Sequence, residues 1–292
     1  MKKYIGYPLL AVLGGAAAFF LRLMQNRTGF ESSTGLPLAG NRFAVALPLL
    51  LALFALASLL LVRRLPGEKA GSVLPFSSCF RTTGAGIPTI LVLGAFAWIA
   101  SGGLFIYNGF LQSGSALTGS LSAVYTTTTG SGILTPRLSL VVGFLCVFSG
   151  ACLIPVVSAC RFRGRHIDSA KTVNASLILL VVACLVILLI ITYREDSINP
   201  SLSVYYVELL AQAGLILTLY RISSFAYREG RTRRFVFYSM MATVLCFATL
   251  ADGHSLAASI FYAGGILLSL GFLILRLNTL IWAETPPAAG EN

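Results

Sequence analysis

Eight long apolar segments constrain the fold of this chain more than any other feature. They lie at about residues 4–24, 43–62, 87–106, 138–160, 173–192, 202–219, 235–250 and 256–275. A helix needs roughly 20 apolar residues to cross about 30 Å of hydrocarbon. Backbone amides in lipid must also be bonded within their own segment, which favours helices. The sequence therefore predicts an all-α integral membrane protein, a polytopic bundle of about eight transmembrane helices.

The composition leaves little material for anything outside the membrane. Only 11% of the 292 residues are charged, against roughly 25% in a soluble domain. The longest connection between apolar segments is about 30 residues, so no soluble domain is expected. We interpret residues 1–280 as a single transmembrane helical domain and residues 281–292 as a short cytoplasmic tail without fixed structure.

Basic residues alternate from one side of the expected membrane to the other. With both termini in the cytoplasm, the cytoplasmic side holds 16 basic residues and the outer side holds five. The outer five are Arg22, Arg27, Arg42, Arg137 and Arg194. This asymmetry is typical of membrane proteins, and we expect a plasma-membrane protein with cytoplasmic termini. The basic connections are expected to contact anionic lipid headgroups, and their placement argues against nucleic-acid binding despite a net charge of +11.

Glu208 is the only carboxylate well inside an apolar segment. Tyr205 precedes it by three residues and Gln212 follows it by four, so the three side chains share one helical face. An ionisable group in the membrane costs at least about 2.5–3.5 kcal/mol, which requires a partner or a role. The favoured interpretation is a structural carboxylate bonded to a neighbouring helix. The functional alternative is a proton or substrate site, and a third is an interfacial position.

Possible partners of Glu208 lie on the same expected side of the membrane. Arg22 ends the first segment and Arg194 ends the fifth, while Asp252 and His254 share the turn between the last two segments. The Asp-Gly sequence is typical of a turn with an exposed histidine; the functional interpretation is an external gate or proton entry. The candidate binding residues are Tyr205, Glu208, Gln212, Arg194, Asp252 and His254.

Signatures of catalysis are few. The chain has two histidines, three aspartates and six cysteines without a CxxC pair, so neither a metal nor another cofactor is expected and we predict a non-enzyme. An intramembrane hydrolase would require Ser113 or Ser115 to pair with His254. Those serines begin Ser113–Gly132, where 14 of 20 residues are Ser, Thr or Gly; we expect an external or interfacial loop, with a re-entrant segment as the alternative.

Small residues indicate where helices approach closely. Gly14 and Ala18 in the first segment, and Gly265 and Ser269 in the last, have the four-residue spacing that lets helix backbones meet. The spacing fits contacts within one chain as well as dimerisation. A homo-oligomer or another protein partner therefore remains open.

The function that fits these features best is transport of a small solute, by this chain alone or as a component of a transporter. The alternative is a non-catalytic membrane scaffold or sensor subunit that acts with a partner. An intramembrane enzyme is the least favoured of the three.

Overall fold

The computed structural model describes residues 4–30, 38, 41–65, 76–80, 82, 84–118, 136–160, 171–196, 202–227 and 229–284. The helices are α1 Gly6–Thr28, α2 Arg42–Arg63, α3 Phe76–Cys79, α4 Gly86–Thr118, α5 Pro136–Cys160, α6 Lys171–Asp196, α7 Leu202–Ala226, α8 Thr232–Thr249 and α9 Leu256–Glu284. Each apolar segment corresponds to one long helix, which confirms the all-α fold class. The short helix α3 was not predicted from the sequence.

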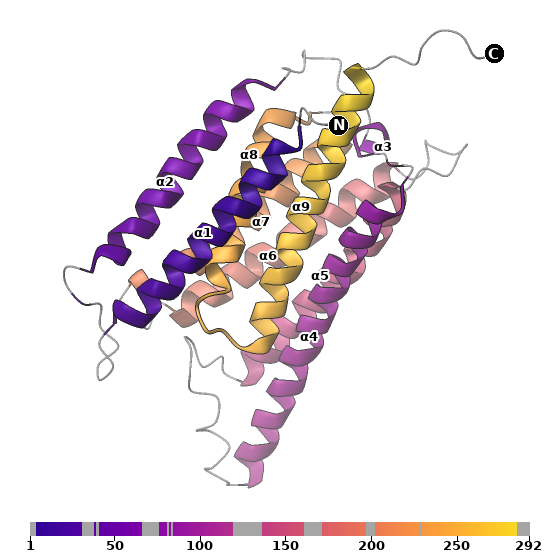
Figure 1. Cartoon of the computed structure of the whole chain (residues 1–292). Helices are drawn as coiled ribbons and strands as arrows, with labels where there is room; N and C mark the ends of the chain where they lie inside the picture. Colours follow the sequence, from indigo (N-terminus) through magenta and orange to yellow (C-terminus); the bar gives the residue numbers. More distant parts are fainter. Residues whose placement is uncertain are drawn as a thin grey trace.

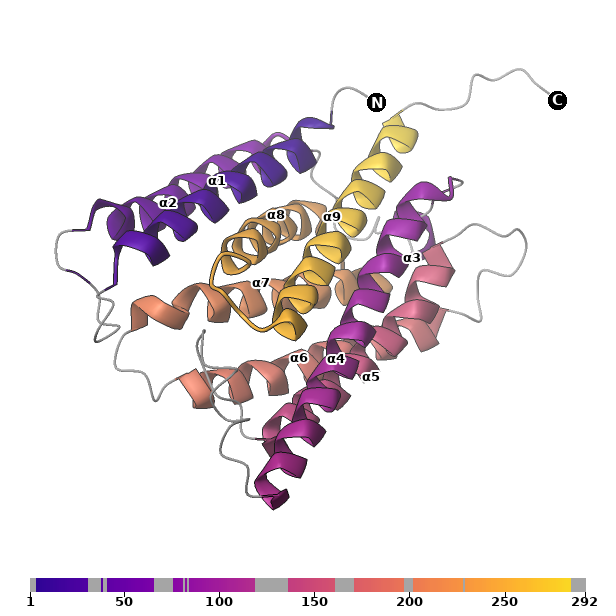
Figure 2. The same ribbon diagram turned by 60° about the horizontal axis from the view of Figure 1, so that its bottom comes forward.

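Seven of these helices are long and apolar enough to span a membrane. The eighth long helix, α8, has only 18 residues and carries Arg233 and Arg234 in its first turn. It lies between α1, α7 and α9 (Figure 2), and 12 of its 18 residues are buried. Because neighbouring helices cover it, α8 needs less apolar surface than a helix in contact with lipid.

The long helices run alternately up and down, so α1 begins and α9 ends at the same end of the bundle (Figure 1). We name this the Arg276 end, after a buried arginine near the end of α9. The other end, where α1 and α8 finish and α7 and α9 begin, is the Glu208 end.

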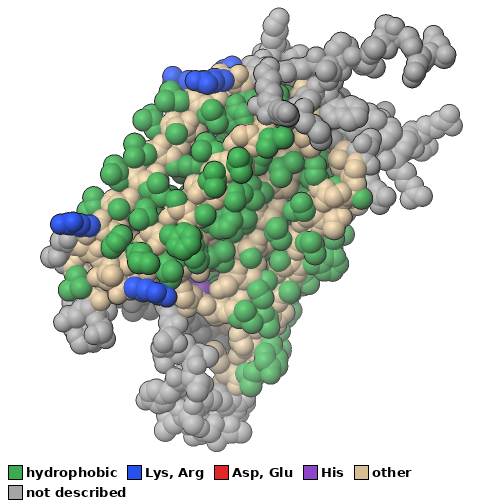
Figure 3. Space-filling view, viewed as in Figure 1, with side chains coloured by type: hydrophobic (Ala, Val, Ile, Leu, Met, Phe, Trp, Pro, Cys, Tyr) green, Lys and Arg blue, Asp and Glu red, His purple; other side chains and the backbone are tan. Residues whose placement is uncertain are grey.

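The outer surface of the bundle requires an apolar solvent. On the face seen in Figure 3, hydrophobic side chains cover the middle of the helices, and Lys and Arg lie near the ends. Helix α2 carries a stripe of exposed large hydrophobic residues at helical spacing: Val45, Leu49, Leu53, Leu56 and Leu60. Such a stripe facing outward fits a lipid-exposed helix surface.

Glycines set the closest helix crossings. A Cβ added to Gly102 of α4 would lie 2.5 Å from the carbonyl oxygen of Gly143 of α5. About two turns earlier in α4, a Cβ on Gly94 would lie 3.1 Å from the carbonyl oxygen of Gly264 of α9. Helix α4 is therefore in near-backbone contact with both α5 and α9.

The small-residue positions singled out in the sequence form contacts within the chain, one of the two alternatives left open by the sequence. Gly14 lies against the ring of Phe54 of α2, and Gly265 lies against Leu215 of α7. The hydroxyl of Ser269 is 2.9 Å from a threonine hydroxyl of α8.

Helices α4, α7 and α9 extend furthest beyond the expected boundaries, and α7 ends at Ala226 rather than at residue 219. Helix α4 continues to Thr118, so residues 113–118 of the expected loop 113–132 are helical, while residues 119–132 lie outside the described residues. Helix α9 continues to Glu284, four residues into the expected tail, and residues 285–292 are likewise outside the described part of the chain. The basic connections at 66–75 and 161–170 fall outside it too.

Candidate functional site

A buried ion pair joins α1 to the turn between α8 and α9. Arg22 of α1 is only 1% exposed, and its Nε donates a hydrogen bond to Oδ1 of Asp252. Its Nη1 donates to Gln25 Oε1 at 3.2 Å, and its guanidinium lies 5.6 Å from the ring centroid of Tyr206. Asn26 Nδ2 donates to the same Asp252 oxygen at 3.0 Å. Two side chains of α1 thus bond to one carboxylate oxygen of Asp252.

The turn owes its shape to Gly253. Its φ is +63°, in the left-handed region that glycine adopts without steric cost. The chain reverses between Thr249 and Leu256, and within that reversal Asp252 contacts α1 while His254 approaches α7. The Asp-Gly-His sequence therefore presents its two ionisable groups to two different helices.

Glu208 forms a second hydrogen-bonded group with α6 and α9. The hydroxyl of Tyr262 donates to Glu208 Oε1 at 2.8 Å. Gln212 Nε2 donates to the Tyr262 hydroxyl at 2.9 Å and to the Thr192 hydroxyl of α6 at 3.0 Å. Because Tyr262 and Gln212 are buried, this layer connects three helices inside the bundle.

His254 lies between the two groups. Its Nε2 is 3.7 Å from Glu208 Oε2 and 4.0 Å from Asp252 Oδ2. The side chains of His254, Glu208 and Asp252 are 6%, 12% and 5% exposed. One arginine, two carboxylates and one histidine therefore form a continuous cluster at the Glu208 end. We call Arg22, Glu208, Asp252 and His254 the charged cluster.

Four of the six candidate residues from the sequence come together here: Glu208, Gln212, Asp252 and His254. The structure corrects the favoured view of His254 as an exposed turn residue, because the left-handed glycine before it directs the imidazole into the bundle.

The other two candidates lie elsewhere. Tyr205 is buried in the first turn of α7, but the phenol bonded to Glu208 belongs to Tyr262. Arg194 has an exposed side chain near the end of α6, outside the buried cluster.

Sequence reasoning missed several members of the site. Gln25 and Asn26 follow Arg22 by three and four residues, and this polar face at the end of the first apolar segment was a usable signal. Tyr262 gave no comparable signal, since it stands alone in the apolar segment of α9. Its role depends on how α9 packs against α7.

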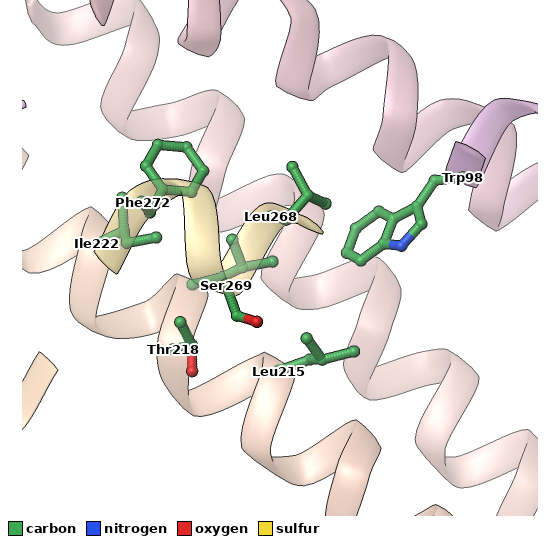
Figure 4. Close-up of a pocket in the computed structure, with 8 residues that line it drawn as sticks. Trp98, Leu215, Thr218, Ile222, Leu268, Ser269 and Phe272 are labelled. Carbon is green, nitrogen blue, oxygen red and sulfur yellow. The ribbon is translucent and has the colours of Figure 1, made fainter. Parts of the chain in front are cut away.

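A small pocket lies further along the same helices, between α4, α7 and α9 (Figure 4). Its cavity volume is about 10 Å³, about the space of a single water molecule and far below the roughly 300 Å³ of a site for a drug-sized ligand. Its lining includes Trp98, Leu215, Thr218, Ser269 and Phe272. Leu215 follows Gln212 by less than one turn, so the pocket continues the α7 face that carries Glu208.

The Arg276 end is held by a different buried arginine. Arg276 is 4% exposed, and its Nε and Nη2 donate to the Thr232 hydroxyl at 3.0 and 2.7 Å. Its Nη1 donates to the Cys79 carbonyl at 3.4 Å, and its guanidinium lies 5.1 Å from the ring centroid of Phe225. These contacts connect α3, α7, α8 and α9.

Comparisons with protein-family models, with curated proteins and with solved structures find no match to this chain. A function must therefore be inferred from the fold and from the geometry of the site.

Proposed function

We propose that this integral membrane protein transports a small solute along a path between α7 and α9. One observation carries the proposal: the buried carboxylate and the mid-bundle pocket share the same helix faces. The Tyr262 hydroxyl of α9 is hydrogen-bonded to both Glu208 and Gln212 of α7. Further along the same two helices, Thr218 of α7 and Ser269 of α9 both line the pocket. A polar layer at one level of α7 and α9, followed by a small pocket further along the same helices, supports a gated path.

Unused hydrogen-bond acceptors around Glu208 support this function. Gln212 Oε1 and Asp252 Oδ2 are buried, and neither has a hydrogen-bond partner within the described residues. An unpaired buried acceptor costs about 1–3 kcal/mol. A carboxylate kept only for structure would be expected in a fully bonded network, whereas a path for a polar solute requires acceptors that can be engaged during passage.

In this structure the pocket has almost no empty space between its lining side chains. Passage of a solute therefore requires α7 and α9 to separate, beginning at the Tyr262 hydrogen bonds to Glu208 and Gln212. Those bonds link side chains only, and each can be exchanged for a bond to water or solute at small net cost.

We propose further that the Glu208 end faces the outside of the plasma membrane and the Arg276 end faces the cytoplasm. The 16-to-5 asymmetry of basic residues supports this orientation. The basic connections at the cytoplasmic side would then contact anionic lipid headgroups.

Cysteine accessibility tests the path without knowledge of the solute. Thr218→Cys places a thiol in the pocket, and Leu217→Cys places one at the same depth on the exposed face of α7. A water-borne, membrane-impermeant methanethiosulfonate added at the Glu208 side is expected to label position 218 about tenfold or more faster than position 217, because thiolates form only where water reaches. The measurement is the labelling rate of full-length protein in proteoliposomes.

The parent chain is the baseline, since all six native cysteines are buried. Equal, slow labelling at positions 217 and 218 from both sides would contradict a water-accessible path. That result would favour the scaffold or sensor function.

A further inference from the structure

We propose that the charged cluster is a binding site for one exchangeable proton, held between His254 and the two carboxylates. The proton site stands on geometry alone. That this proton is the ion coupled to solute movement rests on the transport function proposed above, and it deepens that proposal.

Counted over the four described side chains of the cluster, the charges balance only with one proton added. Arg22 contributes one positive charge, while Glu208 and Asp252 contribute two negative charges. With a neutral imidazole the cluster carries a net charge of −1, and with a protonated His254 it is neutral. Burial of uncompensated charge is costly in a low-dielectric interior, so the buried arrangement favours the form with one proton.

Among the described residues, the titratable groups around His254 come from α7, α9 and its own turn. Glu208 faces it from α7, Tyr262 from α9 with ring centroids 5.8 Å apart, and Asp252 from the same turn. Arg22 of α1 lies on the far side of Asp252. The two described titratable groups nearest to the imidazole nitrogen are thus both carboxylates.

Hydrogen-bonding capacity is free where the proton would sit. Asp252 Oδ1 already accepts from Arg22 and Asn26, which leaves Oδ2 to face the imidazole. Asp252 Oδ2 and His254 Nε2 are both buried, without a hydrogen-bond partner among the described residues.

At 3.7 and 4.0 Å from the carboxylate oxygens, the imidazole nitrogen needs to move only about 1 Å to form a hydrogen bond of ordinary length with either. The step is simple: a proton from the aqueous phase adds to Nε2 of the neutral imidazole, and the same N–H bond breaks on release.

A metal ion fits this position less well. Within the described residues, no group of three or more His, Cys, Asp or Glu side chains is arranged to hold one. Histidine, in contrast, is the side chain whose unperturbed charge change lies nearest to physiological pH.

The chain offers a single-site readout, because His166 and His254 are its only histidines. In a His166→Gln background, ¹⁵N-histidine NMR of the full-length protein in lipid nanodiscs reports the charge of His254 alone. Adding Glu208→Gln is expected to lower the ratio of charged to neutral imidazole at a fixed pH, because the variant removes the negative charge nearest to the imidazole.

Glu229→Gln is the matched control. It removes a carboxylate from the exposed connection before α8, at the Arg276 end, and is expected to leave the ratio unchanged. Asp252→Asn provides a second test, with the same direction expected as for Glu208→Gln. An unchanged ratio in Glu208→Gln, or in Asp252→Asn where the first variant does not fold, would overturn the proton site.

The two proposals fail separately. If the ratio responds to Glu208→Gln while the Thr218→Cys thiol is unreactive, the proton site stands and transport is contradicted. If the thiol is reactive while the ratio does not respond, transport stands and the proton site is overturned.

Discussion

Replacing Arg22 with methionine is expected to lower the free energy of unfolding by about 3–5 kcal/mol, the usual cost of removing one partner of a buried ion pair. Asp252 would keep its hydrogen bond from Asn26 but lose the guanidinium bonded to its Oδ1. Methionine retains much of the apolar stem of arginine, so the loss reports mainly the charge. Denaturant unfolding of the purified protein in detergent measures it.

Two further variants separate the ion pair from general damage to α1. Arg27→Met removes an exposed arginine from the last turn of the same helix and is expected to change stability by less than about 0.5 kcal/mol. Arg22→Met combined with Asp252→Asn removes both charges and is expected to recover much of the loss. A double variant as unstable as Arg22→Met would show that the pairing of charges is not what stabilises this contact.

The helices were predictable because a bilayer allows few alternatives. About eight apolar runs of helical length specify eight long helices once the backbone must bond to itself. Helix α8 illustrates the limit: its lower apolar content reflects burial against α1, α7 and α9, which a prediction made one segment at a time does not include. Its first turn is also placed by a tertiary contact, because Arg233 donates to the carbonyl of Leu65 at 2.6 and 2.9 Å.

The centre of the candidate site was predictable, but its geometry was not. Glu208 is anomalous in its segment, and its side of the membrane follows from the charge count, so Arg22, Asp252 and His254 were identifiable as possible neighbours. Which of them face inward depends on packing between residues as far apart as Arg22 and Asp252. An arginine near a helix end is normally expected to extend toward the headgroups; here it is buried instead.

The hydrogen bonds between the hydroxyls of α8 and α9 were also not predicted from the sequence. The Ser239 hydroxyl of α8 donates to the carbonyl of Ser269 of α9 at 2.7 Å. The Thr243 hydroxyl donates to the Ser239 carbonyl within α8 and lies 2.9 Å from the Ser269 hydroxyl of α9. Serine and threonine in membrane helices form such interhelical bonds, but their partners depend on the rotation of each helix. The same rotation brings Tyr262 to Glu208, which explains why that phenol was missed.

Gly102→Leu is expected to be among the most destabilising single substitutions in the chain, with a loss of about 3 kcal/mol or more, at the upper end of the cost of overpacking. A Cβ at this position would lie 2.5 Å from the Gly143 carbonyl oxygen and 2.7 Å from the Val147 backbone nitrogen. Backbone atoms cannot rotate away as a side chain can, so α4 and α5 would have to separate.

Gly103→Leu is a close control, because it adds the same side chain one residue along the same helix. No atom lies within 4 Å of a Cβ at Gly103, and the residue is exposed. Stability there should be unchanged or slightly higher, since glycine in a helix costs roughly 0.5–1 kcal/mol relative to alanine. Unfolding of both variants in detergent gives the comparison, and similar stabilities would contradict the close α4–α5 crossing.

Since α4 also packs on α9 through Gly94 and Gly264, separation at Gly102 would reach the wall of the pocket as well. In the Gly102→Leu variant, a Thr218→Cys thiol should therefore become more reactive, whereas in Gly103→Leu its reactivity should stay at the parental rate.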